Sequence, residues 1–437
     1  MIAIAGDNIT SSLGFTTAEN YRAAASGQSG VRPYSALMGV PEPLMAALID
    51  RERLADAFAA LCPHPNRYTT LEQAAILSVS RAAEQAQVDL SDAGALFVVS
   101  STKGNVHLLD ENEKGFSHSH LYLWYAARLI AAYFGNPNAP LVVSNACISG
   151  ACAQVAAMRE LRSGLYTLAV VVGVEVLSRF IISGFQSLKA LSPAPCRPFD
   201  VSRAGLNLGE AAATIIYRRV EAGAEADVEA DVERRAEAGA EADVEAGVER
   251  SAEAGAERSA EADVEAGAEA GAEGALGVAL LRGAIRNDAN HISGPSRTGE
   301  GSFRALQAVM REASPADVAF VNAHGTATAY NDSMEAAAIT RAGLSQAPVN
   351  SLKGCFGHTL GAAGVLESVI SARALANETA LATHGFKCGE AALPLNVTSQ
   401  NIRTTKPCCV KMLSGFGGGN AALLFGKIKT RKPCRKP

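Results

Sequence analysis

A tetrapeptide repeat with glutamate at every fourth position runs from Glu221 to Glu273 and interrupts the 437-residue chain. On a helix these glutamates would lie one above another and repel at each i,i+4 step, and the intervening glycines would weaken the helix further. Fourteen Glu and four Asp against four Arg between residues 221 and 276 give the segment a net charge of −14. We therefore predict a mobile, partly helical acidic insert at residues 221–274, which leaves the chain on its two sides to form the folded body.

Apolar segments typical of strands flank the insert. Residues 211–218 read AAATIIYR and residues 275–286 read ALGVALLRGAIR. The repeat then lengthens the connection between two strands, and a surface hairpin is the natural place for such an expansion. We interpret the insert as dispensable rather than as an acidic lure or spacer.

The composition is that of an ordinary soluble enzyme, with 48% hydrophobic and 19% charged residues and enough length to bury a large core. No apolar stretch approaches the roughly 18 residues of a membrane span, and no signal peptide is recognisable. We therefore expect a cytoplasmic protein without a membrane span. Nine cysteines without a CxxC pair fit a compartment where thiols stay reduced.

The net charge of −5 hides a basic body, because the insert carries −14 and the remaining residues carry +9. Six of those positive charges lie in residues 427–436, and residues 428–437 form a predicted basic tail. About +3 is left on the core, where local basic patches could favour an acidic partner. Only the short tail would suit nucleic acid, so no nucleic-acid binding is expected.

Cys147 is the candidate nucleophile. It lies between residues 141–144 (LVVS), which favour a strand, and residues 149–161 (SGACAQVAAMREL), which have helical spacing. A helix N-terminus offers free N–H groups and a positive dipole end, so we expect the thiolate to be favoured there. On this segment alone a buried structural cysteine is the favoured interpretation, and only the other motifs of the chain reverse it in favour of catalysis. Cys152 is interpreted as packed inside the helix, with no chemical role.

Two histidines and a lysine complete the candidate site. His324 follows a predicted strand at residues 319–321, and open sheets place their sites at the carboxyl ends of strands. Lys353 and His358 lie on either side of a turn, and the small apolar neighbours of Lys353 indicate burial. A thiol that accepts an acyl group, with two neutral imidazoles that stabilise an enolate, is suited to forming a carbon–carbon bond.

The motifs SNACISGAC, PFDVSRAGLNLGEAAA, HGTAT, KGCFGHTLGAAG and SGFGGGNAALLF occur in this order. In order and spacing the chain resembles the beta-ketoacyl synthases of fatty acid and polyketide assembly. The resemblance implies an α/β, thiolase-like fold of two similar halves stacked as five layers (αβαβα). The N-terminal half, with the nucleophile, would span residues 1–220, and the C-terminal half would span residues 275–427.

The resemblance also implies roles for individual residues. Cys147 would accept the acyl group, and His324 and His358 would hydrogen-bond the malonyl thioester carbonyl and stabilise the enolate. Lys353 would form a structural and electrostatic link, and Glu335, which follows His324 by eleven residues, would be its acidic partner.

Three further residues take their roles from the same resemblance. The N–H of Phe416 would join the N–H of Cys147 as the oxyanion hole, and the Phe416 ring would gate the acyl channel. Thr326 and Thr328 would bind the pantetheine arm of a carrier, although on local sequence alone they are equally suited to capping a loop.

The implied reaction is a decarboxylative Claisen condensation between an acyl thioester and malonyl carrier protein, without a cofactor or metal. The loop GFGGGN is not followed by the Lys-Ser/Thr of a nucleotide site, and His118 with His120 is too small a set for a metal. The expected partners are an acyl carrier protein and either a second copy or a related ketosynthase-like subunit.

Other interpretations are less well supported by the motifs. A thiolase or a CoA-primed initiation synthase would need a second catalytic cysteine or a His–Asn pair. A non-catalytic chain-length-factor-like subunit would be expected to lose the nucleophile, whereas Cys147 and both histidines are present. The segment SNAC, residues 412–414 and Gly419 depart from the commoner pattern, so the chain also resembles the aryl polyene or flexirubin-type branch.

Overall fold

The computed structural model describes residues 1–109, 115–220, 276–390 and 394–428. The predicted insert and nearly all of the basic tail lie outside these residues. The strands of the main sheet are β1 (Ile2–Ser11), β4 (Ala95–Ser100), β5 (Leu141–Val143), β6 (Leu168–Glu175), β8 (Ala211–Arg219), β9 (Val278–Asn287), β10 (Val318–Asn322), β11 (Val349–Asn350), β14 (Cys408–Gly415) and β15 (Gly419–Lys427). Their order is β11-β10-β14-β15-β9-β1-β8-β6-β4-β5.

The sheet consists of two halves with the same topology. In the N-terminal half, β5, β4 and β6 are parallel, and β8 and β1 follow antiparallel. In the C-terminal half, β11, β10 and β14 are parallel, and β15 and β9 follow antiparallel. The corresponding strands also come in the same order along the chain. The halves meet where Ala3 of β1 pairs with Ala279 of β9.

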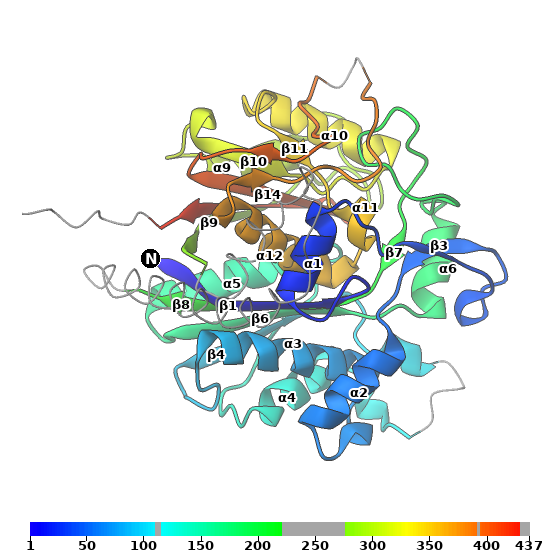
Figure 1. The fold of residues 1–437 in the computed structure, drawn as a ribbon, viewed down its shortest axis with the longest axis vertical. Coiled ribbons are helices and arrows are strands. Elements are labelled where there is room, and N and C mark those ends of the chain that lie inside the picture. The colour runs from blue at the N-terminus through cyan, green and yellow to red at the C-terminus, as the bar shows by residue number, and fades with distance from the viewer. Residues whose placement is uncertain (110–114, 221–275, 391–393, 429–437) are drawn as a thin grey trace, which may run out of the picture.

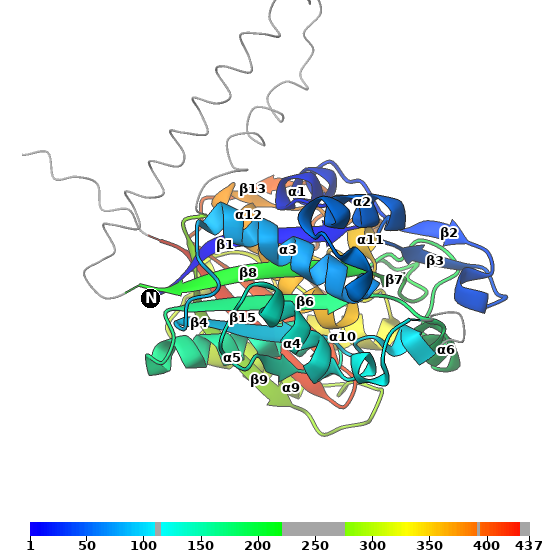
Figure 2. The same ribbon diagram turned by 90° about the horizontal axis from the view of Figure 1, so that it is seen from below.

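Helices cover both faces of each half, which produces the five expected layers (Figure 1). The helices are α1 (Thr17–Ala25), α2 (Arg51–Leu61), α3 (Thr70–Ala86), α4 (Leu123–Tyr133), α5 (Ser149–Ser163), α6 (Arg179–Ser187), α9 (Glu300–Val309), α10 (Ala329–Arg341), α11 (Lys353–Phe356) and α12 (Ala363–Ala376). α5 and α12 lie between the halves in one shared apolar core, whereas α3 and α4 cover the outer face of the N-terminal half (Figure 2). α9 and α10 cover the outer face of the C-terminal half.

The two central helices touch backbone to backbone at their first turns. A Cβ atom on Gly150 of α5 would lie 2.8 Å from the backbone nitrogen of Val365 in α12. Such contact is possible only where side chains are absent, and Gly364 faces Gly150 across the crossing. Because Cys147 precedes α5 and His358 precedes α12, this crossing brings the two residues to the same place.

The predicted strands and helix are present, but the predicted hairpin is wrong. β8 and β9, which flank the insert, do not pair with each other, because β1 lies between them and pairs antiparallel with both. The sequence pattern identifies strands but not their neighbours, and here the N-terminal strand occupies the intervening place. Among the described residues, no helix has the length and apolar character needed to cross a membrane.

Two small sheets lie outside the main layers. The first joins β2 (Arg32–Tyr34), β3 (Leu44–Ala47) and β7 (Leu208–Gly209), and the second joins β12 (Thr379–Ala380) and β13 (Ile402–Arg403). Leu208 of β7 also forms a bridge to His358. The first small sheet therefore fixes the backbone on one side of the candidate site.

Candidate functional site

Cys147 lies in a tight turn between β5 and α5. Ala146 has a φ of +45°, an unfavourable conformation for a residue with a side chain. The turn is held by the Ile148 N–H, which donates to the Asn145 carbonyl at 3.2 Å, and by the Asn145 N–H, which donates to Ser149 Oγ at 2.8 Å. The strained turn thus directs the Cys147 side chain away from the strand and into the interior.

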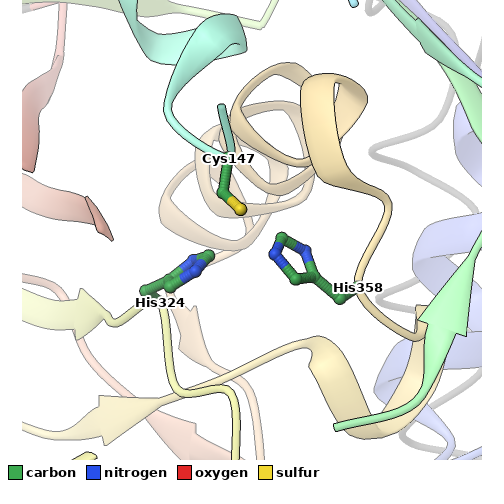
Figure 3. Close-up of side chains that lie close together, drawn as sticks. All are labelled: Cys147, His324 and His358. Carbon is green, nitrogen blue, oxygen red and sulfur yellow. The ribbon is translucent and has the colours of Figure 1, made fainter. Parts of the chain in front are cut away.

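The two predicted histidines face the thiol. His324 follows β10 and His358 precedes α12, and their ring centroids are 5.0 Å apart at an interplanar angle of 81°. The Cys147 sulfur and an imidazole nitrogen from each histidine lie within 4.8 Å of one another (Figure 3). All three side chains are buried. The structure therefore brings together three residues that the sequence separates by up to 211 positions.

Both imidazoles are neutral at physiological pH. Burial, with a smaller contribution from the Lys353 ammonium, holds the pKa of His324 and of His358 well below the usual value. The Leu360 N–H donates to His358 Nδ1 at 3.3 Å, so Nδ1 is an acceptor and the His358 proton lies on Nε2. Each neutral ring can offer one N–H donor to a substrate oxygen.

The expected thiolate at Cys147 is not favoured in the free protein. Burial raises the pKa of the Cys147 thiol to about 11, although Lys353 and the Phe416 N–H act in the opposite direction. The prediction from the helix N-terminus was wrong, because desolvation of the buried thiolate is the largest contribution to this pKa. The thiol must therefore lose its proton during attack, and the neutral imidazoles beside it can accept a proton.

Lys353 is buried as predicted, but its acidic partner is not Glu335. The Lys353 ammonium pairs with the Glu367 carboxylate of α12. Glu335 instead accepts the backbone N–H groups of His324 and Gly325, each at 2.7 Å. Glu335 therefore fixes the backbone that presents His324.

Two buried residues of this cluster were missed by the sequence analysis. Glu367 lies in the mostly apolar helix α12, and Lys411 lies in the mostly apolar strand β14. Lys411 Nζ pairs with Glu367 Oε2 at 2.6 Å, while Lys353 pairs with Oε1. A charged residue within a buried apolar run was the available signal, because charges are rarely buried without partners.

A cavity of about 410 Å³ leads to the thiol and is lined by Cys147, both histidines, Thr326, Thr328 and Phe416. The hydroxyl oxygens of the two threonines are 2.9 Å apart. The Phe416 N–H hydrogen-bonds the Cys147 sulfur, and its ring, 37% exposed, lies at 5.9 Å from the ring of Phe185. Every residue predicted to contact substrate therefore lines this one cavity.

The residues interpreted as structural lie away from this chemistry. Cys152 is buried in α5, and the Asn145 side chain donates to its sulfur at 3.6 Å. His118 is exposed, whereas His120 is buried and pairs with Glu72 at 3.1 Å, so the two histidines do not share a ligand. By contrast, Cys147, His324 and His358 are close enough to hold a metal ion such as Zn²⁺.

Sequence comparison identifies the same two-part organisation. Residues 2–222 match the N-terminal domain of the beta-ketoacyl synthases, and residues 278–387 match the C-terminal domain. A 3-oxoacyl-[acyl-carrier-protein] synthase 2 from Rhizobium meliloti (strain 1021) is 28% identical over 297 residues, covering 65% of this chain and 59% of the relative. Nodulation protein E from Rhizobium leguminosarum bv. trifolii is 27% identical over 312 residues, covering 69% of this chain and 65% of the relative. The chain thus spans less than two thirds of the length of these relatives.

Solved structures show the same fold along nearly the whole chain. A ketosynthase in complex with its chain length factor from Xenorhabdus doucetiae has a TM-score of 0.77 and 22% identity, with 98% of both chains covered. A beta-ketoacyl synthase from Burkholderia phymatum STM815 has a TM-score of 0.76 and 22% identity, with 98% of this chain and 99% of the other covered. These similarities confirm the thiolase-like fold. With both domains matched in order on either side of the acidic repeat, the chain belongs to the beta-ketoacyl synthase family.

Proposed function

We propose that the protein is a beta-ketoacyl-[acyl-carrier-protein] synthase that joins an acyl thioester to malonyl carrier protein in fatty acid or polyketide synthesis. The main support is the meeting of a buried thiol with two neutral imidazoles in the lining of one cavity of about 410 Å³, with the sulfur and one nitrogen of each ring within 4.8 Å of one another. A purely structural cysteine would not need two buried imidazoles beside it.

In the first half-reaction the Cys147 sulfur attacks the carbonyl of the acyl thioester. The backbone N–H groups of Cys147 and Phe416 stabilise the tetrahedral oxyanion. When the intermediate collapses, the carbon–sulfur bond to the carrier breaks, and the proton from Cys147 ends on the departing carrier thiol. The product is an acyl group bound to Cys147.

In the second half-reaction malonyl carrier protein occupies the same cavity. His324 and His358 donate N–H groups to its thioester carbonyl, so the enolate that forms as carbon dioxide leaves is stabilised. The enolate carbon attacks the acyl carbonyl on Cys147, and the Cys147–carbon bond breaks. The cysteine sulfur leaves with the electron pair of that bond and takes up a proton from solvent, while the product is a beta-ketoacyl carrier.

The partner we propose is an acyl carrier protein whose pantetheine arm passes Thr326 and Thr328. The basic balance of the chain outside the repeat supports an acidic partner. One structure with a similar fold contains an acyl-carrier protein in complex with its ketosynthase. We place the reaction in the cytoplasm, and the departures at SNAC and Gly419 support an aryl polyene or flexirubin-type substrate as an alternative to ordinary fatty acids.

Intact-mass spectrometry with acyl carrier and then malonyl carrier tests the proposal. We expect an acyl adduct on the protein that is consumed when malonyl carrier is added, with a longer beta-ketoacyl carrier as product. If short, long and aryl primers all leave the protein unmodified, while a known active synthase accepts them, the chain is instead a non-catalytic partner subunit.

Removal of metal is expected to leave the condensation rate unchanged, because neither half-reaction uses a metal ion. Added Zn²⁺ should inhibit, since it would compete for the sulfur and imidazole nitrogens that lie within 4.8 Å of one another. The rate is measured after dialysis against EDTA, with and without added Zn²⁺. Loss of activity on dialysis that Zn²⁺ restores would contradict the proposed mechanism.

The free edge of β5 is the proposed dimer interface. Within the part of the chain that the structure describes, β5 is the last strand of the sheet, and Leu141 and Val142 are 36% and 37% exposed there. An exposed apolar edge strand pairs readily with another strand. We expect Val142→Lys to weaken dimerisation by at least about 30-fold, as seen by light scattering across a concentration series.

The control for the edge strand is Leu165→Lys, because Leu165 is also exposed but lies outside the strands of the sheet. It should leave the dimer intact. A Val142→Lys protein that dimerises like wild type would exclude this edge. A wild-type protein that is monomeric alone would favour a heterodimer with a related subunit.

A further inference from the structure

Lys411 is a buried lysine for which the proposed half-reactions assign no role. Its side chain is fully buried in β14, and its Nζ donates to the carbonyls of Met412 at 2.7 Å, Ala323 at 3.2 Å and Asn322 at 3.4 Å. Ala323 directly precedes His324. The ammonium therefore holds the carbonyl side of the backbone that presents this histidine.

The other side of that backbone is held by a carboxylate. Glu335 accepts the N–H groups of His324 and Gly325, so His324 lies between a fixed acceptor and a fixed donor. Lys411 also pairs with Glu367 Oε2 at 2.6 Å, and Glu367 belongs to the helix that follows His358. One ammonium thus links the supports of both imidazoles.

Glu367 already has a complete ion pair without Lys411. Lys353 occupies Oε1, and Lys411 adds a second buried ammonium to the same carboxylate. Burying an additional charge costs free energy even when the charge is paired. A structural ion pair with Glu367 would therefore not need the second lysine.

We propose that Lys411 is a positioning residue for malonyl decarboxylation, which holds His324 in place and, while protonated, favours the enolate electrostatically. This inference rests on the proposed function. The charged groups that face Lys411 are Glu367 from α12, Lys353 from α11 and Glu335 from α10. Loss of the Lys411 proton makes this cluster more negative by one charge, which opposes formation of a negative enolate.

The same geometry separates the two half-reactions. The charge of Lys411 acts on both imidazoles and lowers the pKa of each, whereas the charged groups that shift the pKa of the Cys147 thiol are Lys353, Glu175 and Lys103. Lys411 should therefore matter for decarboxylation and little for acyl transfer to Cys147.

Lys411 should titrate in an accessible range. Burial lowers the pKa of Lys411 to about 8, with Glu367 opposing the shift and Lys353 adding to it. Lysine is positive below its pKa, so the wild-type decarboxylation rate should be full below about pH 8 and should fall as the pH rises through that value.

The test measures decarboxylation of malonyl carrier protein from about pH 6.5 to about pH 9.5 for the full-length wild type and for Lys411→Met. This range extends to both sides of the expected titration of Lys411. The variant should be slower by about 10- to 100-fold at neutral pH and should lack the alkaline decline near pH 8. Its acylation of Cys147, followed by intact mass, should stay within about 2-fold of wild type.

Lys427→Met is the matched control, since Lys427 lies on the neighbouring strand β15 and pairs with Glu378 at 2.9 Å outside the cavity. It should keep both the rate and the alkaline decline. Unchanged decarboxylation in Lys411→Met, or equal loss of acylation and decarboxylation with the decline retained, would overturn the inference. Should the variant not fold, a wild-type rate that stays constant through pH 8 would overturn it as well.

Failure of the proposed function gives a different result. In that case wild-type Cys147 would accept no acyl group from any primer, whatever residue stands at position 411. If the wild type is acylated and the decarboxylation rate of Lys411→Met equals that of the wild type, only the role of Lys411 is refuted.

Discussion

Cys147→Ala is expected to abolish the acyl adduct and to lower condensation by at least about 10³-fold, because this sulfur carries the acyl chain between the half-reactions. The thiol lines the cavity, with the Phe416 N–H hydrogen-bonded to its sulfur. Intact mass of the protein and mass analysis of the carrier product measure the two losses separately. Alanine is smaller than cysteine and should fit without displacing the imidazoles.

The matched control is Cys152→Ala, which removes a buried thiol five positions further along the same segment. That variant should keep the adduct and most of the condensation rate, with only a modest loss of stability from the cavity it leaves. An adduct that persists in Cys147→Ala but disappears in Cys152→Ala would show that the nucleophile had been assigned to the wrong cysteine.

His324→Ala and His358→Ala are each expected to lower malonyl decarboxylation by about 10²- to 10³-fold, because each removes one N–H donor from the enolate. Acylation of Cys147 should survive in both variants, since its oxyanion is held by backbone N–H groups and the remaining imidazole can still accept the thiol proton. The rate of carbon dioxide release and the extent of acylation distinguish the two effects. Equal loss of both would indicate that the histidines act mainly in acyl transfer.

The pH profile provides a second check on the histidines. Because the pKa of each buried imidazole lies well below the usual value, both stay neutral as the pH falls from 7 to about 6. Decarboxylation in the wild type should therefore not decline across this range. His118→Ala, at an exposed position, is the control and should change neither the rate nor the profile.

Individual elements were predictable from local patterns, whereas the fold and the reacting residues were predictable only from the family resemblance. Apolar runs identified the strands on either side of the repeat, but the segment around Cys147 alone favoured a structural cysteine. Family resemblance then connected His324 and His358 to that cysteine, although they are far apart in the chain. The duplicated strand order agrees with the two halves expected from the same resemblance.

The supporting contacts were not predictable, because they depend on which surfaces pack together. Glu367 rather than Glu335 pairs with Lys353, since α12 places that carboxylate beside the lysine, whereas the Glu335 carboxylate binds the backbone N–H groups of His324 and Gly325. Lys411 joins the same carboxylate from a strand in another part of the chain.

The amino-acid sequence by itself determined which chemical groups are present and which elements position them. Only the tertiary structure decided their electrostatic state. Burial raises the pKa of the Cys147 thiol and lowers that of both imidazoles, opposite in the first case to what the helix N-terminus alone would produce. The physical reason is that desolvation depends on everything packed around a group, whereas a local motif specifies only its neighbours along the chain.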